Sequence, residues 1–494
     1  MRNKKLMLNT VTSLLLKIIT IICGFILPKL MLKTYGSAVN GLMNSIAQFL
    51  TIISFLELGI GAVVKSALYR PLATGDIEST SRIVSSAQKF FERLAMIFGG
   101  YVVILALIYP ELVIQKFDFL FTATLIIVLS IHSFTQNYLG IVGGLLIGAD
   151  QLGYIRYILQ IIAMVLNTGL SVILIRCGQS VHVVKGMAAA VYCIVPLGQR
   201  LYINKHYRLN RKIKYKGEPI AQKWNGIAQH VAAVVLDSTD NIVLTVFSTL
   251  ENVSIYSVYH LVVFGINELV GSLTNGVQAL LGELWARQEK TELTRTFEWT
   301  EWIIHTVTVF VFGCTTILIT PFVQVYTKGV TDANYFQPLF GVSIALANML
   351  SCLRDPYIMM VLAAGHYRQT QKSYIIATLI NVVFSIVTVS QFGLIGVAIG
   401  SLMAMLYHMV WLAYYTMKNL LHQSFHGFFK QVFIDTMSFG LAAMLSQSFD
   451  LSAVNYFAWV VLAIKVAFVW LGVIIVVNFF FYHEKMAEIM RIKK

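Results

Sequence analysis

Long runs of apolar residues, separated by short polar stretches, follow one another along the whole 494-residue chain. Most runs extend for about 20 residues, the length with which an α-helix crosses the hydrocarbon core of a bilayer. The short segments of alternating polarity that are typical of a membrane β-barrel do not occur. The pattern therefore predicts an all-α polytopic membrane protein.

We assign about 14 transmembrane helices to this pattern and place both termini in the cytoplasm. The composition agrees, because 57% of the residues are hydrophobic and only 12% are charged, too few for the polar shell of a soluble protein. The predicted helices have the ranges 8–32, 38–64, 86–108, 119–147, 156–175, 183–203, 227–249, 255–282, 299–323, 336–363, 373–390, 393–417, 431–447 and 456–481.

The most basic stretch lies near the middle of the chain, at 200–223, where eight lysines and arginines face a single acid, Glu218. Lysine and arginine resist translocation, so a short basic loop stays on the cytoplasmic side. The assignment puts 28 of the 37 lysines and arginines on that side. The net charge of +14 is thereby explained by loops that face anionic lipid, and we expect no nucleic-acid partner.

Two halves of the chain repeat one order of motifs. Asn167 and Ser171 precede a Gly-x-Ala segment at 186–188, and Asn381 and Ser385 precede another at 396–398, about 210 residues later. We therefore predict two parallel six-helix lobes around a central site, with two helices appended. The predicted divisions are an N-lobe at 1–203, a basic linker at 204–226, a C-lobe at 227–417, and the last two helices with a basic tail at 418–494.

Three cations within predicted spans are candidates for binding an anionic headgroup, because a charge in the hydrocarbon region is costly and usually functional. Lys17 lies near mid-depth of the first span, with pairing to Asp237 or another acid as the alternative. Arg354 precedes Asp355 and Pro356, a sequence that breaks a helix, and a structural arrangement with Asp355 is its alternative. Lys465 is a weaker candidate of the same kind.

Acidic residues within the spans are candidates for binding a coupling proton or sodium ion. Asp237 and Asp240 follow His230 at helical spacing, and pairing to Lys17 or Arg354 is the alternative for both. Glu57 and Glu268 are weaker candidates, with a structural role as the alternative. Asp435, by contrast, is expected near the inner surface and solvated.

No motif indicates a catalytic residue, a cofactor or a metal. The five cysteines are scattered without C-x-x-C pairing, and no nucleotide-binding loop occurs. We expect a protein that is not an enzyme and has no cofactor beyond a coupling proton or sodium ion.

Several short motifs occur along both halves: YGS with GL at 35–42, LELGIG at 56–61, LYRPLA at 68–73, and VSIY at 253–256 after the span with Asp237. With the paired Asn-x-x-x-Ser and Gly-x-Ala segments, they resemble bacterial polysaccharide repeat-unit flippases of the multidrug/oligosaccharidyl-lipid/polysaccharide exporter superfamily. The resemblance covers essentially the whole chain.

This resemblance implies that the protein moves an undecaprenyl-pyrophosphate-linked oligosaccharide from the inner to the outer leaflet of the bacterial cytoplasmic membrane. The implied partners are this lipid-linked glycan, membrane lipids, and polysaccharide polymerase or assembly proteins.

Four alternatives remain. A lipid II flippase of the same superfamily would carry more arginine in its first span than the single Lys17 here. A drug antiporter of the superfamily usually has twelve spans and acidic N-lobe sites. A sugar porter of the major facilitator class would show a signature between its second and third spans that Ser66 to Arg82 lack. A non-transporting scaffold of a glycan assembly complex would need no charges in its interior.

Overall fold

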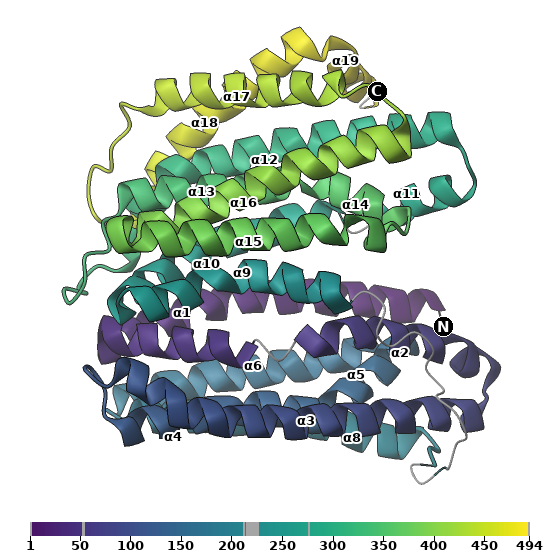
Figure 1. Cartoon of the computed structure of the whole chain (residues 1–494), viewed down its shortest axis with the longest axis vertical. Coiled ribbons are helices and arrows are strands. Elements are labelled where there is room, and N and C mark those ends of the chain that lie inside the picture. The colour runs from purple at the N-terminus through teal and green to yellow at the C-terminus, as the bar shows by residue number, and fades with distance from the viewer. Residues whose placement is uncertain (1, 52–54, 211–212, 214–226, 275–276, 493–494) are drawn as a thin grey trace. The chain divides into compact units, whose positions relative to one another are not determined.

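The computed structural model describes residues 2–51, 55–210, 213, 227–274 and 277–492 (Figure 1). These residues form helices joined by turns, without a strand. Eleven of the described helical stretches are long and apolar enough to cross a membrane. The predicted all-α polytopic architecture is therefore confirmed, whereas the count of fourteen spans stays a prediction.

The chain divides into two compact units, residues 1–234 and 235–494. The finer predicted division, with its linker and C-terminal pair, stays a prediction. Most of the basic linker lies outside the described residues. The N-terminal unit contains α1 (Arg2–Thr51), α2 (Phe55–Thr74), α3 (Ile77–Val113), α4 (Phe119–Thr135), the π-helix η2 (Gln136–Gly140), α5 (Ile141–Ala149), α6 (Gly153–Arg176), α7 (Val181–Tyr192) and α8 (Ile194–His206).

The first two predicted spans meet where α1 is interrupted. Gly36 has φ +83° and ψ 170°, a conformation that glycine adopts without steric cost because it lacks a Cβ. The interruption falls in the gap between the predicted ranges 8–32 and 38–64, so this boundary was readable from the sequence.

The basic segments of the N-terminal unit gather at one end of its helices. Lys5 lies 3.8 Å from Asp150 at the turn between α5 and α6, and the Tyr207 hydroxyl donates to the same carboxylate at 2.6 Å. Asn210 N donates to Ser81 Oγ of α3 at 3.1 Å. These contacts join segments that the charge pattern assigns to one side of the membrane.

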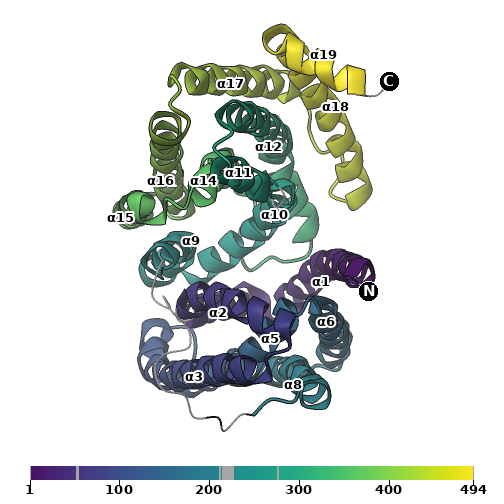
Figure 2. The same cartoon turned by 90° about the vertical axis from the view of Figure 1, so that its right-hand side faces the viewer.

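The C-terminal unit is built around α12 (Figure 2). Helices α11, α13, α14, α17 and α18 all pack against α12. The elements of the unit are α9 (Ile227–Phe247), which begins just before it, α10 (Leu250–Thr274), α11 (Val277–Ala286), α12 (Lys290–Tyr326), α13 (Pro338–Leu353), α14 (Asp355–Ala363), α15 (Tyr367–Phe392), α16 (Leu394–Tyr415), the π-helix η3 (Thr416–Leu421), α17 (His426–Ser446), α18 (Tyr456–Phe481) and α19 (His483–Ile492).

The repeated Asn-x-x-x-Ser residues lie at buried helix contacts. Asn167 and Ser171 are buried on α6, and Asn381 and Ser385 are buried on α15. On α16, Gly400 approaches α15 so closely that a Cβ there would lie 2.9 Å from the carbonyl oxygen of Asn381 and overlap Ser385. Gly396 of the Gly-x-Ala segment likewise leaves no room for a Cβ beside the backbone of Thr388 and Val389, so both glycines permit close helix packing of the kind that small residues allow in membranes.

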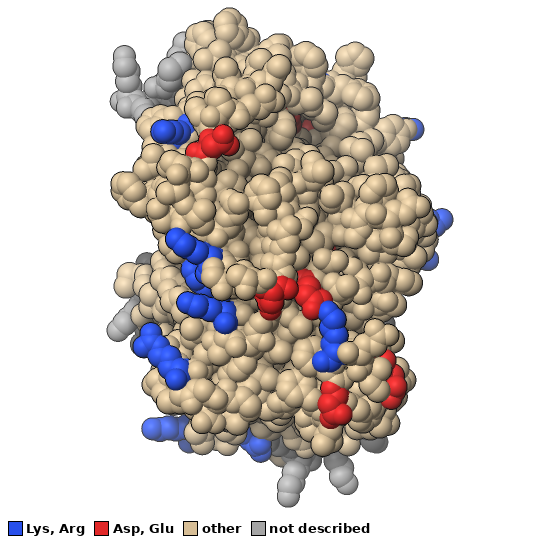
Figure 3. All heavy atoms as spheres, turned by 90° about the vertical axis from the view of Figure 1, so that its left-hand side faces the viewer, with Lys and Arg blue, Asp and Glu red and all other residues tan. Residues whose placement is uncertain are grey.

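The outer surface of the helices is apolar. Large side chains such as Ile104, Leu107 and Phe468 are exposed along the helices, whereas Figure 3 looks onto one end of the helices and shows lysines, arginines and acidic side chains there. A soluble protein would not leave so much apolar surface in water. These faces fit contact with acyl chains, as expected of a multi-pass membrane protein.

The packing of α12 against α18 yields a stability prediction. A Cβ on Gly313 would overlap the buried indole of Trp470, which also meets Phe439 of α17 edge to face at 5.3 Å. We expect Gly313→Ala to destabilise the protein by about 1–3 kcal/mol, because overpacking forces the ring or the helix to move. The check is the melting temperature of purified protein. Gly472→Ala on α18, where nothing lies within 4 Å, is the control, and equal melting temperatures for the two variants would contradict this account.

Candidate functional site

One face of α16 carries a line of polar contacts that joins two of the predicted site residues. Ser401, Met405 and His408 follow at spacings of four and three, so they point in the same direction from the helix. Ser401 forms a hydrogen bond with Asp240 of α9, and Met405 and His408 both contact the guanidinium of Arg354. Ser401 and His408 are seven residues apart, so the contact with Asp240 and the contact with Arg354 are separated by about 10 Å along the helix.

The carboxylate of Asp240 lies at the centre of the first cluster. Its side chain is buried, with 8% exposed. The Ser401 hydroxyl donates at 2.8 and 2.7 Å to the two carboxylate oxygens, Tyr256 donates at 3.0 Å, and Asn381 Nδ2 donates at 3.4 Å. Four helices, α9, α10, α15 and α16, therefore meet at this carboxylate.

Two amide oxygens on α9 and α15 accept no hydrogen bond from the residues that the structure describes. Asn241 Oδ1 and Asn381 Oδ1 are buried, and neither accepts a hydrogen bond from a described residue. Buried acceptors are normally satisfied, and carboxylate, amide and hydroxyl oxygens are the ligands that hard cations prefer. Among the described residues no group of three His, Cys, Asp or Glu side chains is placed to hold a metal ion. A single carboxylate with neutral oxygens better suits a proton or a monovalent cation.

Arg354 lies at the break between α13 and α14, as the Arg-Asp-Pro sequence predicted. Its Nη1 donates to His408 Nδ1 at 2.8 Å and contacts Met405 Sδ at 3.4 Å, and its Nη2 donates to Ser351 Oγ at 3.2 Å. Because the guanidinium is always protonated, His408 accepts through Nδ1 and its ring is neutral.

The guanidinium has no carboxylate partner within 4.0 Å in the described part of the chain, Asp355 included. Its Nε is buried and donates to no described acceptor, while the residue as a whole is only half-buried. The alternative of an Arg354–Asp355 ion pair is therefore not what the structure contains. A fork-shaped cation with a spare donor is suited to a phosphate group.

Five further residues were predicted as site residues. Lys17 is exposed on α1 of the N-terminal unit, and Glu268 is exposed on α10. Lys465 is exposed on α18 beside the exposed Ile464 and Phe468. The side chains of Glu57 and Asp237 lie outside those that the structure describes. The roles predicted for these five residues stay predictions.

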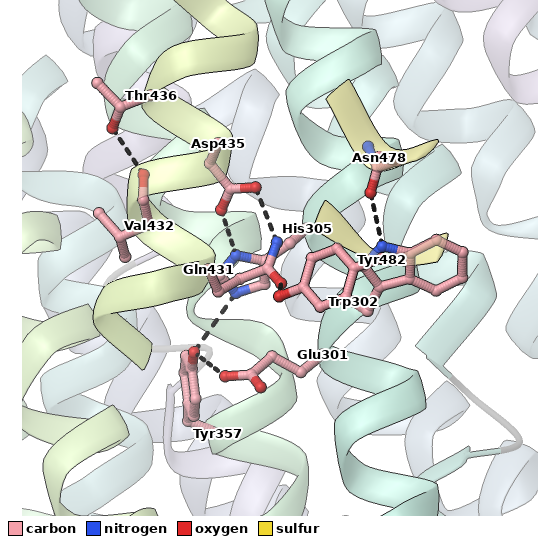
Figure 4. A network of polar contacts seen from close by, with 10 residues as sticks. All are labelled: Glu301, Trp302, His305, Tyr357, Gln431, Val432, Asp435, Thr436, Asn478 and Tyr482. Carbon is pink, nitrogen blue, oxygen red and sulfur yellow. Dashed lines mark hydrogen bonds and ion pairs between the residues drawn. The ribbon is translucent and has the colours of Figure 1, made fainter. Parts of the chain in front are cut away.

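A second polar cluster, which the sequence analysis missed, lies around α12 (Figure 4). His305 Nδ1 is 2.6 Å from Asp435 Oδ2 of α17, and the Tyr357 hydroxyl of α14 donates to Glu301 Oε1 at 2.5 Å and lies 3.5 Å from His305 Nε2. Gln431 Nε2 donates to Asp435 Oδ1 at 2.9 Å. The sequence signal was an acid and a histidine four residues apart inside the predicted span 299–323.

This cluster corrects the expectation for Asp435. The carboxylate is not solvated near the surface, because only 8% of the residue is exposed and its oxygens are bound by His305 and Gln431. The mistake has a physical cause. The depth of a residue along its helix was judged from the end of an apolar run, while the neighbouring helices that bury it cannot be seen in one segment.

The fold is similar to that of solved transporters. No protein-family model matches the chain, and no curated protein matches it significantly. The lipid II flippase MurJ in an inward closed conformation matches with a TM-score of 0.68 and 14% identity, covering 97% of this chain and 100% of that one.

An inward-facing multidrug resistance MATE family transporter of the MOP superfamily matches with a TM-score of 0.57 and 16% identity, covering 80% of this chain and 93% of that one. The Vibrio cholerae MATE transporter VcmN matches with a TM-score of 0.55 and 13% identity, covering 84% and 98%. The chain therefore has the MOP-exporter-like fold of MurJ and MATE transporters.

The Asp240 cluster yields a second stability prediction. We expect Ser401→Ala to cost about 1–3 kcal/mol, because it removes a donor from a buried carboxylate. Thermal unfolding of the purified protein measures the loss. Ser343→Ala is the matched control, since that half-buried residue donates its hydroxyl only to Leu339 O of its own helix. A loss no larger than that of the control would show that Ser401 does not support Asp240.

Proposed function

We propose that the protein is a flippase that moves undecaprenyl-pyrophosphate-linked oligosaccharide repeat units across a bacterial cytoplasmic membrane by alternating access. The likeness to MurJ and MATE transporters supports transport, and the motif resemblance favours a lipid-linked glycan. The observation that carries the proposal is the Arg354 guanidinium, which lies inside the helical unit without a carboxylate within 4.0 Å among the described residues.

A cation at such a position needs a compensating charge. A charge taken out of water is unfavourable unless an opposite charge or several hydrogen bonds replace the lost solvation. Arg354 has three neutral partners and one spare buried donor. A pyrophosphate supplies both negative charge and acceptor oxygens, so binding of the headgroup would provide the compensating charge and the acceptors that Arg354 lacks.

His408 holds the guanidinium ready for this ligand. The histidine is fully buried, and its ring packs edge to face on Tyr374 at 4.3 Å. A guanidinium fixed by a rigid neutral acceptor loses little conformational freedom when it binds a phosphate. In this proposal Lys17 and Lys465 are further contacts for the headgroup, while the polyprenyl tail stays in lipid.

The Asp240 cluster is the proposed coupling site. A sodium ion there would be held by the carboxylate together with the amide oxygen of Asn381, whose Nδ2 contacts Asp240, and a proton would be held by the carboxylate itself. Asp237, Glu57 and Glu268 remain proposed contributors. Since Asp240 and Arg354 both bind α16, movement of this helix on cation binding would reach the headgroup site directly.

A lipid II flippase is the second candidate, favoured by the similarity to MurJ. Its substrate also carries a pyrophosphate, so Arg354 fits both candidates and the glycan distinguishes them. A drug antiporter is less well supported, because the guanidinium repels cationic compounds. We place both termini in the cytoplasm and propose polysaccharide polymerase and assembly proteins as partners.

Substitution of Arg354 tests the proposal. We expect Arg354→Ala to abolish surface polysaccharide and to leave lipid-linked repeat units on the inner leaflet, and Arg354→Lys to retain part of the activity, because a lysine keeps the charge without the fork. The measurements are surface glycan and the leaflet position of the lipid-linked precursor. Arg368→Ala, an exposed arginine on α15, is the control.

The outcome separates the candidates when the variant is present in the membrane at the level of the wild type. Normal export by Arg354→Ala would favour a scaffold over a flippase. Normal surface polysaccharide in a deletion strain, together with trapped peptidoglycan precursor, would favour the lipid II flippase.

The proposed sodium site gives a separate prediction. At sodium about tenfold above the dissociation constant, binding stabilises the folded protein by about 1.4 kcal/mol. We expect the melting temperature in sodium chloride to exceed that in choline chloride, and Asn381→Leu to remove the difference, because it removes the amide oxygen. A sodium effect that survives Asn381→Leu would place the ion elsewhere, and its absence in the wild type would leave the proton as the coupling ion.

A further inference from the structure

The buried cluster on α12 contains more negative groups than positive ones. Glu301 and Asp435 contribute two carboxyls, and His305 contributes one imidazole. The Tyr357 hydroxyl donates to Glu301, and His305 faces Asp435 with Nδ1 at 2.6 Å and Tyr357 with Nε2 at 3.5 Å. With His305 protonated between these groups and both acids ionised, the cluster has a net charge of −1.

The remaining charge is located on Glu301. Asp435 is neutralised by His305 at 2.6 Å and by Gln431, whereas Glu301 accepts from the neutral Tyr357. Glu301 is 7% exposed, so an ionised carboxylate there needs a second counter-charge, since a buried unpaired charge is strongly unfavourable.

Lys485 on α19 is the lysine whose charge acts on Glu301. Its ammonium group lies 5.0 to 5.8 Å from the rings of Tyr482, Trp302 and Trp299 and donates to Glu298 O at 2.9 Å. Burial lowers the pKa of Lys485, and Glu298 and Glu301 oppose this shift. The lysine is therefore an electrostatic partner of Glu301 that belongs to a terminal helix.

A cavity of about 650 Å³ connects these groups. It is lined by Glu301, Gln431, Tyr482, Lys430 and Lys485 among others, and the Tyr482 hydroxyl donates to Gln431 Oε1 at 2.6 Å. Water in such a cavity would bring protons to Glu301. The cavity thus gives the buried carboxyl a route for proton exchange.

We propose that Glu301 is a proton-binding site for which the proton and Lys485 are alternative counter-charges. While the Lys485 ammonium group lies among the rings of Trp299, Trp302 and Tyr482, Glu301 stays ionised. When α19 carries Lys485 away, one proton passes from cavity water to a Glu301 carboxylate oxygen, and the cluster becomes neutral. The site is separate from Asp240, and it links proton uptake to the position of α19.

The surrounding helices bring these ionisable groups to the cluster: Glu298 and His305 of α12, Tyr357 of α14, Lys430 and Asp435 of α17, Tyr482 after α18, and Lys485 of α19, with His483 and Glu484 at the cavity. Helix α13 contributes the Leu353 backbone to His305, and no described side chain of α10 or α11 adds a charge. Lys485 is thus the cation that acts on Glu301 from outside the buried network.

Infrared spectroscopy of the full-length purified protein in lipid nanodiscs tests this proposal. We expect the carbonyl stretch of a protonated carboxylic acid to grow as the pH is lowered, and Glu301→Gln to remove it. In Lys485→Gln we expect the band to appear at a proton concentration at least about tenfold lower than in the wild type, because the competing cation is gone. Lys418→Gln, on the exposed lysine bound to Tyr414, should titrate like the wild type.

Two results would overturn the proposal: a band that persists in Glu301→Gln, or a Lys485→Gln titration that coincides with the wild type. If Glu301→Gln does not fold, Tyr357→Phe provides the assignment, since loss of its hydroxyl must raise the frequency of the Glu301 band, and an unshifted band assigns it to another group. The measurement needs no glycan, so its failure is distinguishable from failure of the flippase function.

Discussion

A charge inside an apolar helical unit has to be compensated by its immediate neighbours, because no solvent is available to do so. Three charged clusters of the C-terminal unit meet this requirement in different ways. Asp240 is surrounded by hydroxyl and amide donors, and Asp435 is paired with His305. Arg354 is held by neutral acceptors. The less the charge of a cluster is compensated by the protein itself, the more readily that cluster can bind an ion of opposite charge.

The helix framework fixes these differences. Arg354 lies at the break between two helices, because α13 ends at Leu353 and α14 begins at Asp355. The direction of its side chain is therefore not set by the regular spacing of one continuous helix. Asp240 reaches Ser401 because α15 and α16 pack closely at Gly396 and Gly400, which brings Asn381 and Ser401 together. Backbone irregularities and small residues therefore decide where polar side chains meet, while the apolar exterior secures the fold in lipid.

Much of the fold could be predicted because single segments carry their own signal. The last predicted span, 456–481, coincides with α18 (Tyr456–Phe481), and Gly36 and Arg354 interrupt helices near the predicted breaks. Arg354 and Asp240 were identified as candidates from their charge and depth alone. Their connection through α16 was not, because Ser401, Met405 and His408 are unremarkable in sequence and gain their role only from the helices that face them.

Side-chain contacts between residues far apart in the chain were the main feature that could not be predicted from the sequence. Asp435 was expected in solvent because its own helix begins nearby, yet His305, 130 residues earlier, buries and binds it. Glu301 and His305 were counted only as part of the apolar span 299–323. Lys485 was counted only as part of a basic tail that sets orientation. Such residues become informative when the packing shows which opposite charge each one meets.

The contrast between Arg354 and Glu301 bears on how transport and energy supply are divided. A guanidinium cannot lose its proton, so the charge on Arg354 is constant and only an anionic ligand can compensate it. A carboxylate can be neutralised by a proton or a cation, so Glu301 and Asp240 can change charge during a cycle. The proposed flippase function requires both kinds of group: a permanent charge that would recognise the headgroup in every state, and exchangeable charges that would differ between states. The C-terminal unit holds both: Arg354 at the break between α13 and α14 and Asp240 on α9, each bound to a side chain of α16, and Glu301 on α12.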